Sequence, residues 1–251
     1  MTLVELARDL LLAMMEKSGV QEWTNPSIRE QLVIAAREMA ENLWGYWDMA
    51  TSKILVPAFD GTPKQITFGN YAGDFSPTAA NDLRDGTGGN RTDVEIVLAA
   101  LANSTSESTG SVQSAKFDFG SLRAPAYKVS CAFELAATPT ADAVIELWLA
   151  PSHSATAGTG NPGNASGASG AYSGYSSNIG SSLKQCVRIG DFVCTVQATG
   201  TIQVSRNCGI IVPPNRYGSL IVWNKSGAAF HSDDVECHVV FDPIFLQSQA
   251  A

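Results

Sequence analysis

One short segment combines a histidine with two carboxylates, the residue types that bind transition metals or transfer protons. It contains His231, Asp233 and Asp234, directly before the last predicted strand. This spacing is compatible with a metal site or an acid–base pair. It is equally typical of a solvated turn, which is the interpretation we favour. His238 follows within the strand, where it alternates with core residues, and we expect it to face solvent or a neighbouring molecule.

The remaining motifs do not favour catalysis. Gly158, Gly160 and Gly163 have GxGxxG spacing, but Pro162 lies inside the motif and no predicted helix follows to hold a phosphate. The sequence contains no GxxxxGKS/T, HExxH or GxSxG motif. We therefore predict a protein that is not an enzyme, with no catalytic residues, no cofactor and no metal. A hydrolase whose dispersed carboxylates are brought together by a sheet is the alternative.

The cysteines are spaced unlike metal ligands or a redox motif, because no two of them form a CxxC pair. Free cysteine is among the most buried residue types, so we expect small apolar side chains and no full disulfide framework. The five residues are Cys131, Cys186, Cys194, Cys208 and Cys237.

The net charge of −8 restricts the partners of the chain. Its 16 Lys and Arg residues are scattered, whereas a protein that neutralises phosphates needs them clustered. The first residues are acidic where a secretory signal would be basic, and the apolar run from Leu10 to Met15 is too short to span a bilayer. We predict that the chain binds neither nucleic acid nor membrane.

Two amphipathic helices are predicted within residues 1–50. The first covers residues 2–17, and the second follows Asn25 and Pro26 as far as Gly45. Neither would be stable alone in water, so each apolar stripe is buried against the chain itself or against a partner. We interpret the segment as an anchoring or assembly element. Its assembly surface would consist of Leu6, Leu10, Met14, Leu32, Met39, Leu43, Trp44 and Trp47.

The spacing of apolar residues becomes that of strands after residue 50. Residues 51–91 are predicted to form connecting strands and loops, and residues 92–246 a β domain in which Trp148 and Trp223 are buried. Turn residues separate the strands, so we predict a mainly β fold, an antiparallel β-sandwich of jelly-roll type, preceded by the short helical segment. The strand candidates are residues 53–59, 64–68, 92–101, 114–119, 127–136, 143–150, 183–198, 201–212, 219–224 and 234–241.

A long segment, residues 152–182, interrupts the strands. It is rich in Gly, Ser and Ala and contains no Lys, Arg, Asp or Glu. Loops of this length are uncommon in a compact domain unless they are functional or disordered. It is either a passive excursion or a contact arm that becomes ordered on a neighbouring subunit.

Two stretches of the C-terminal part resemble a known class of protein. They read AYKVSCAFELAATPTADAVIELWLAPSHSATAGTGNPGNASG and VPPNRYGSLIVWNKSGAAFHSDDVECHVVFDPI. Both resemble the β-sandwich module of virion structural proteins of tailed bacteriophages, over roughly residues 92–245. The resemblance implies attachment to a capsid, neck or tail in a decoration, spike or fibre-like role. It implies other virion proteins as partners, a homo-oligomer, and a virion location after synthesis in the host cytoplasm.

The alternative is a carbohydrate- or receptor-binding jelly-roll module of a tail component, since jelly rolls also occur in lectins. Its ligand would be a host surface glycan. Loop aromatics would form the contact platform, namely Tyr172, Tyr175 and Tyr217.

Overall fold

A computed structural model describes residues 47–48, 53–54, 63–86, 88–121 and 123–244. The chain divides into two units, Met1–Asp60 and Gly61–Ala251. In the first unit, β1 (Trp47–Asp48) pairs antiparallel with β2 (Lys53–Ile54). The two predicted helices lie outside the described residues, as do all residues of the expected assembly surface except Trp47.

The second unit is built mainly of strands, which confirms the predicted mainly β class. Most strand candidates from residue 111 onward are found, with shifted ends. In chain order its elements are β3 (Gln65–Gly69), η2 (Gly88–Asn90), β4 (Arg91–Glu95), β5 (Ser111–Gln113), β6 (Phe117–Asp118), β7 (Ala126–Glu134), β8 (Val144–Ser152), η3 (Pro162–Asn164), β9 (Gly170–Ala171), α3 (Ile179–Leu183), β10 (Val187–Val193), β11 (Ile202–Ile211), β12 (Tyr217–Lys225) and β13 (His238–Ile244).

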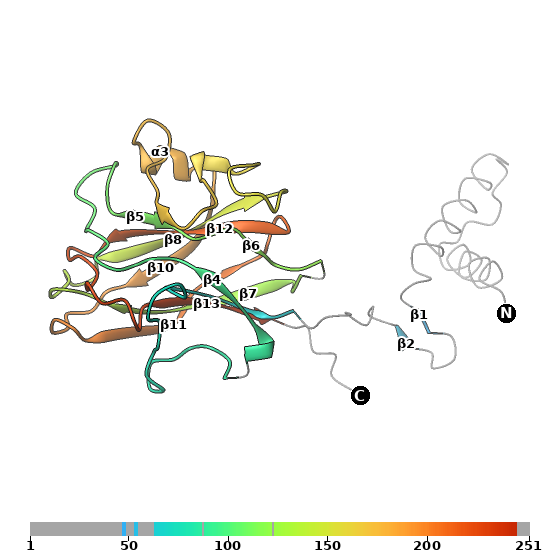
Figure 1. The fold of residues 1–251 in the computed structure, drawn as a ribbon, viewed down its shortest axis with the longest axis horizontal. Coiled ribbons are helices and arrows are strands. Elements are labelled where there is room, and N and C mark those ends of the chain that lie inside the picture. The colour runs from blue at the N-terminus through green and yellow to red at the C-terminus, as the bar shows by residue number, and fades with distance from the viewer. Residues whose placement is uncertain (1–46, 49–52, 55–62, 87, 122, 245–251) are drawn as a thin grey trace, which may run out of the picture. The chain divides into compact units, whose positions relative to one another are not determined.

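The strands form one curled mixed sheet, a half-barrel (Figure 1). Its order is β4-β3-β13-β7-β11-β10-β8-β12-β5-β9, with β6 paired to β12. The strands β3 and β4 are parallel, so the expectation of a purely antiparallel arrangement is wrong. β3 pairs with β13 and is therefore part of this sheet.

The sheet has a narrow waist between β10 and β11. These strands share a single ladder pair, Gly190 with Gly209. A Cβ at either glycine would overlap a backbone carbonyl oxygen of the other strand, at Cys208 or Ile189, so only glycine allows this approach. We call β4-β3-β13-β7-β11 the first half of the sheet, and β10-β8-β12-β5-β9 with β6 the second half.

The two halves enclose one hydrophobic core. Alternate residues of β7 and β13 in the first half, and of β8 and β12 in the second, belong to a single buried cluster. Aromatic rings from the two halves meet inside it. Phe68 lies edge to face with Phe117 at 5.0 Å between centroids, and Phe133 does so with Phe192, also at 5.0 Å. Such pairs add to the stability gained from burial alone.

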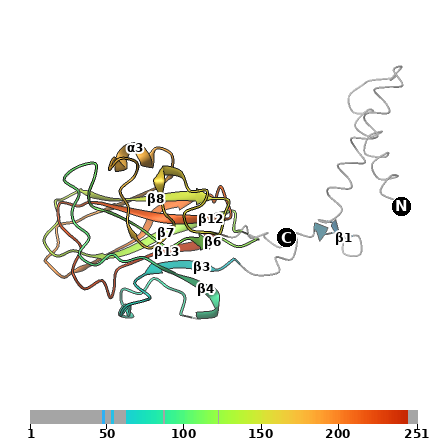
Figure 2. The same cartoon turned by 45° about the horizontal axis from the view of Figure 1, so that its top comes forward.

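Each half is also covered on part of its outer face. The segment after β8, including α3, lies over β8 and β12 (Figure 2). It buries Ile221 and Trp223, and Trp223 is only 3% exposed, as predicted. Trp148 is half-buried, so its predicted full burial is wrong. On the first half, Leu83 packs on Val240 and Ala132.

Candidate functional site

The His231 segment contains a structural carboxylate. Asp234 is 3% exposed and accepts hydrogen bonds from the backbone N–H groups of Leu98 and Ala99, both at 3.0 Å. It also accepts one from the side chain of Asn70 at 3.0 Å. Asp234 therefore binds the loop after β3 and the loop after β4 to the segment that precedes β13. The favoured interpretation of a solvated turn is wrong for this residue. His231 Nδ1 accepts from the Asp233 backbone N–H at 3.2 Å.

His238 is buried, with no exposed surface, so the expectation that it faces solvent is wrong. The reason is the loop that follows β3, which lies on the outer face of β13. The Leu83 backbone N–H donates to Nε2 at 3.1 Å, and Nδ1 lies 2.7 Å from the Glu236 carbonyl oxygen. The imidazole ring also makes an edge-to-face contact with the ring of Phe75, at 5.6 Å between centroids. Burial lowers the pKa of His238, which favours the neutral ring.

The cysteines are free, and all except Cys186 are buried, which confirms their predicted role as small apolar residues. Burial raises the pKa of Cys237 and of Cys186 to about 12, so both thiols are protonated at neutral pH. No group of three His, Cys, Asp or Glu side chains able to hold a metal ion occurs among the described residues.

The segment 152–182 packs against its own chain over β8 and β12, and the contact arm that becomes ordered on a neighbouring subunit stays a prediction. Tyr172 is 3% exposed, and its hydroxyl donates to the Gly163 carbonyl at 2.5 Å. Its backbone N–H donates to Ser111 O at 3.1 Å, and Ser111 Oγ donates back to Tyr172 O at 2.6 Å. Tyr172 is thus the anchor of the segment and not part of an exposed platform.

Lys116 organises the start of the same segment. Its ammonium group donates to the carbonyl oxygens of Thr156 and Thr159, at 2.7 and 2.8 Å, and to Ser152 Oγ at 3.0 Å. Three acceptors satisfy all three N–H groups of a lysine. A segment without charged residues is therefore held in place by a cation from β5–β6.

The other two platform tyrosines are more accessible. Tyr175 is 50% exposed, just before α3. Tyr217 is half-buried at the start of β12, and the guanidinium group of Arg216 lies over its ring at 5.1 Å from the centroid. Arg216 also forms a bidentate ion pair with Asp118, in which Nε donates to Oδ1 at 3.0 Å and Nη2 to Oδ2 at 2.8 Å. Of the three predicted contact residues, Tyr175 alone presents a large exposed ring.

A shallow hollow among the described residues lies near the waist of the sheet, where β10 and β11 separate. It has a volume of about 270 Å³. The register of β10 against β8 shifts near Gly190, and that of β11 against β7 shifts before Gly209. Such bulges bend a strand and increase its twist, which turns the two strands apart. We call this hollow the β10–β11 gap; its lining is Phe192, Val193, Thr195, Gln197, Thr201, Ile202, Gln203, Val204 and Ser205.

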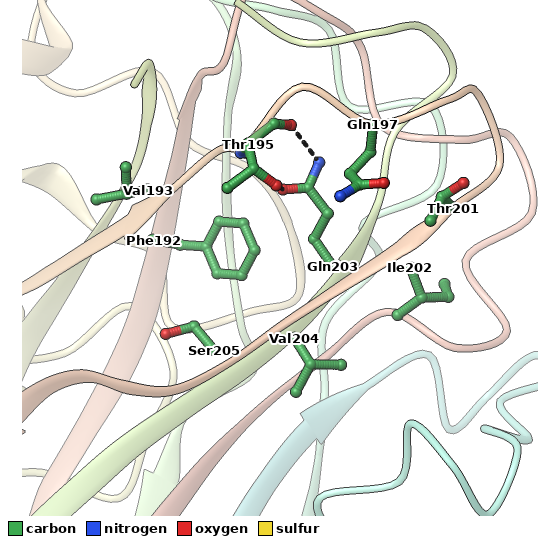
Figure 3. A pocket seen from close by; sticks show the side chains of 9 residues that line it. All are labelled: Phe192, Val193, Thr195, Gln197, Thr201, Ile202, Gln203, Val204 and Ser205. Atoms are coloured by element: carbon green, nitrogen blue, oxygen red, sulfur yellow. Dashed lines mark hydrogen bonds between the residues drawn. The ribbon is translucent and has the colours of Figure 1, made fainter. Parts of the chain in front are cut away.

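A glutamine amide bridges the gap at one end (Figure 3). The Thr195 backbone N–H donates to Gln203 Oε1 at 2.9 Å, and Gln203 Nε2 donates to the Thr195 carbonyl at 3.0 Å. The side-chain amide therefore makes the same two bonds to Thr195 that the opposite residue of an antiparallel strand would make with its own N–H and C=O. Gln203 is 8% exposed, so this pairing is shielded from water.

The sequence contains signals for this gap that are not chemical motifs. Gly190 and Gly209 interrupt two strand-like runs, and glycine inside a strand often marks a bulge or a close backbone approach. Gln203 is a polar residue within a β-branched run. None of the residues selected from the sequence as contact or assembly residues lines the gap.

In the part of the chain that the structure describes, no helix has the length and hydrophobicity to cross a membrane. In comparisons with known proteins, no family model, no curated protein and no solved structure matches the chain.

Proposed function

We propose that the chain is a non-enzymatic structural protein of a tailed-phage virion, attached to the capsid, neck or tail. The observation that best supports this proposal is that three ionisable side chains, which could act in catalysis, instead make structural hydrogen bonds. Asp234, His238 and Lys116 each bond to the backbone of a loop and hold that loop on the sheet. Side chains engaged in this way stabilise a stiff scaffold, which is what a particle component requires.

The proposed fold of this scaffold is a sandwich of the two halves. Inner faces that share one core and meet at a single ladder pair fit two layers better than one continuous sheet. A jelly-roll-like module of this kind is what the resemblance to tailed-phage virion proteins implies.

The proposed attachment uses the residues before the sheet. An anchoring segment with the apolar residues Leu6 to Trp47 would bind other virion proteins or further copies of the chain, as a homo-oligomer. Mass spectrometry of gradient-purified particles tests the proposal. We expect the chain in a fixed ratio to the major capsid protein. Its presence in the infected lysate but not in the particles would contradict a virion role.

A second candidate is a carbohydrate- or receptor-binding module, favoured by the 50% exposure of Tyr175 within a segment that contains no charged residue. Aromatic rings of this kind support sugar rings by apolar contact. Binding to a glycan array that is lost in Tyr175→Ala would favour this role. Tyr175→Phe is the matched control, because it keeps the exposed ring and removes only the hydroxyl, and it should bind like wild type. Equal binding by both variants would exclude Tyr175 as the contact.

A further inference from the structure

Two of the five free cysteines lie against each other on neighbouring strands. Cys131 is on β7 and Cys208 is on β11, and these strands pair antiparallel. Both side chains belong to the core, where Cys131 is fully buried and Cys208 is 5% exposed. The Cys208 thiol donates to the carbonyl oxygen of Ser205 at 3.9 Å, and Ser205 is the ladder partner of Cys131. The Cys208 sulfur is therefore held at the residue directly opposite Cys131.

The bulge of β11 is what brings the two sulfurs together. Ser205 lies opposite Cys131, and the register of the pair shifts before Gly209. Cys208 comes three residues after Ser205, so regular alternation would turn it to the opposite face of the sheet from Cys131. The extra residues of the bulge bend the strand and turn Cys208 into the same core as Cys131.

The two thiols differ in acidity. The hydrogen bond with the Cys131 thiol is the main cause that lowers the pKa of Cys208, against the effect of burial, and a bond from the Cys131 backbone N–H adds to it. Burial raises the pKa of Cys131 well above its usual range. Cys208 is thus the thiol that ionises first, with a protonated thiol beside it. This is the arrangement of an attacking cysteine and a resolving cysteine.

The waist of the sheet gives a small oxidant a route to Cys208. The single ladder pair between β10 and β11, Gly190 with Gly209, comes directly after Cys208. Around Cys208, β11 is otherwise paired with β7 alone. Local opening of such a weakly paired strand costs less free energy than global unfolding, and hydrogen peroxide is little larger than a water molecule.

We propose that Cys131 and Cys208 form a peroxide-sensitive thiol pair that closes to a disulfide between β7 and β11. The Cys208 thiolate attacks one oxygen of hydrogen peroxide and breaks the O–O bond, which leaves a sulfenic acid and a hydroxide that takes up a proton to become water. The Cys131 sulfur then attacks the Cys208 sulfur and displaces its hydroxyl group, which leaves as water with the Cys131 proton. Two electrons pass from the thiols to the peroxide. This chemistry does not depend on the virion role proposed above.

The disulfide would close a long loop of the chain. The segment between the two cysteines contains β8, β9, α3 and β10. A cross-link between residues so far apart restricts the unfolded chain. We therefore expect the oxidised protein to unfold at a higher urea concentration than the reduced protein. A lower midpoint would overturn the proposal, because the core would then not accommodate the bond.

Peptide mapping under non-reducing conditions tests the proposal on the full chain, after titration of the reduced protein with hydrogen peroxide. We expect one linked pair of peptides, which contain Cys131 and Cys208, and the loss of two of the five free thiols. Cys131→Ala should leave Cys208 as a sulfenic acid that reacts with dimedone. Cys194→Ala is the matched control from the same core and should still form the link.

Cys186 separates this proposal from oxidation by exposure alone. It is the one cysteine of the five that is not buried, but burial of its thiol still raises its pKa to about 12. We therefore expect it to react with peroxide after Cys208. The proposal is overturned if Cys186 is oxidised before Cys208, or if Cys208 is oxidised without a link to Cys131. It is also overturned if no thiol of the folded protein reacts.

Discussion

The outer face of β8 and β12 and the β10–β11 gap both lie next to a buried glutamine amide, Gln113 and Gln203, but only the first is covered. Over β8 and β12, Gln113 bonds to Ser166 and Ala171 of the covering segment. In the gap, Gln203 bonds only to Thr195 at the end of the hairpin. The difference teaches that an uncharged, glycine- and serine-rich segment is how this protein covers a strand edge. The gap is the place where such a segment is lacking within the described residues.

The largest expected effect comes from the covered face. Trp223→Ala should lower the free energy of unfolding by about 3–5 kcal/mol, the range for a buried tryptophan. The reason is that the covering segment packs directly on this side chain. Urea denaturation measures the loss. Trp148→Ala is the matched control on the neighbouring strand and should cost less, since Trp148 is half-buried. Equal losses in the two variants would show that the covering segment is not held by Trp223.

The next effect concerns the cation that orders the start of the covering segment. Lys116→Met keeps the length of the side chain but leaves the Thr156 and Thr159 carbonyls without their donor. We expect a loss of about 1–3 kcal/mol, together with faster proteolysis near these residues. Lys184→Met, at an exposed position, should change the stability by less than about 0.5 kcal/mol. Unchanged proteolysis in Lys116→Met would mean that the segment is ordered without its cation.

The strands of the fold could be predicted because their local pattern is strong. Ile145, Leu147 and Leu149 alternate in β8, and all three are fully buried. The waist could not be predicted, because it depends on one contact between Gly190 and Gly209 that no local pattern specifies. The same holds for the parallel pairing of β3 with β4.

The burial of single polar residues was also hard to predict, because it depends on contacts with distant parts of the chain. His238 has the alternation of an exposed position, yet a loop more than a hundred residues earlier in the chain covers it. Tyr172 lies in a low-complexity segment and is nevertheless an anchor. Local periodicity shows which face of a strand a residue occupies, but not whether a distant loop covers that face.

His238 extends the comparison to the covered face of the first half and predicts a pH dependence. Burial is the main cause of its lowered pKa, and Arg84 adds to it, whereas Asp82 and Glu236 oppose it. The folded state therefore binds this proton less readily than the unfolded chain, whose histidine has a pKa of about 6.5. Stability from the neutral ring is present above about pH 6.5 and is lost as the pH falls towards the lowered pKa.

The measurement is the unfolding free energy of wild type and of His238→Gln across this pH range. The difference between the two should narrow on acidification by at most about 1.4 kcal/mol per pH unit, the limit for one proton. Glu134, whose pKa burial raises, is present in both proteins and cancels in the difference. A constant difference between the two proteins would show that His238 is not kept neutral by the covering loop.

The smallest expected effect is at the gap, and it is the one that separates an open edge from a covered face. Val204→Lys should change the stability of the free protein by less than about 0.5 kcal/mol, because a lysine at a side chain 41% exposed keeps its ammonium group in water. Ile221→Lys, on the face that α3 covers, should unfold the protein, since Ile221 is fully buried. If Val204→Lys instead cost several kcal/mol, the edges of β10 and β11 would have to be closed against each other in solution. The contrast between the gap and the covered face would then disappear.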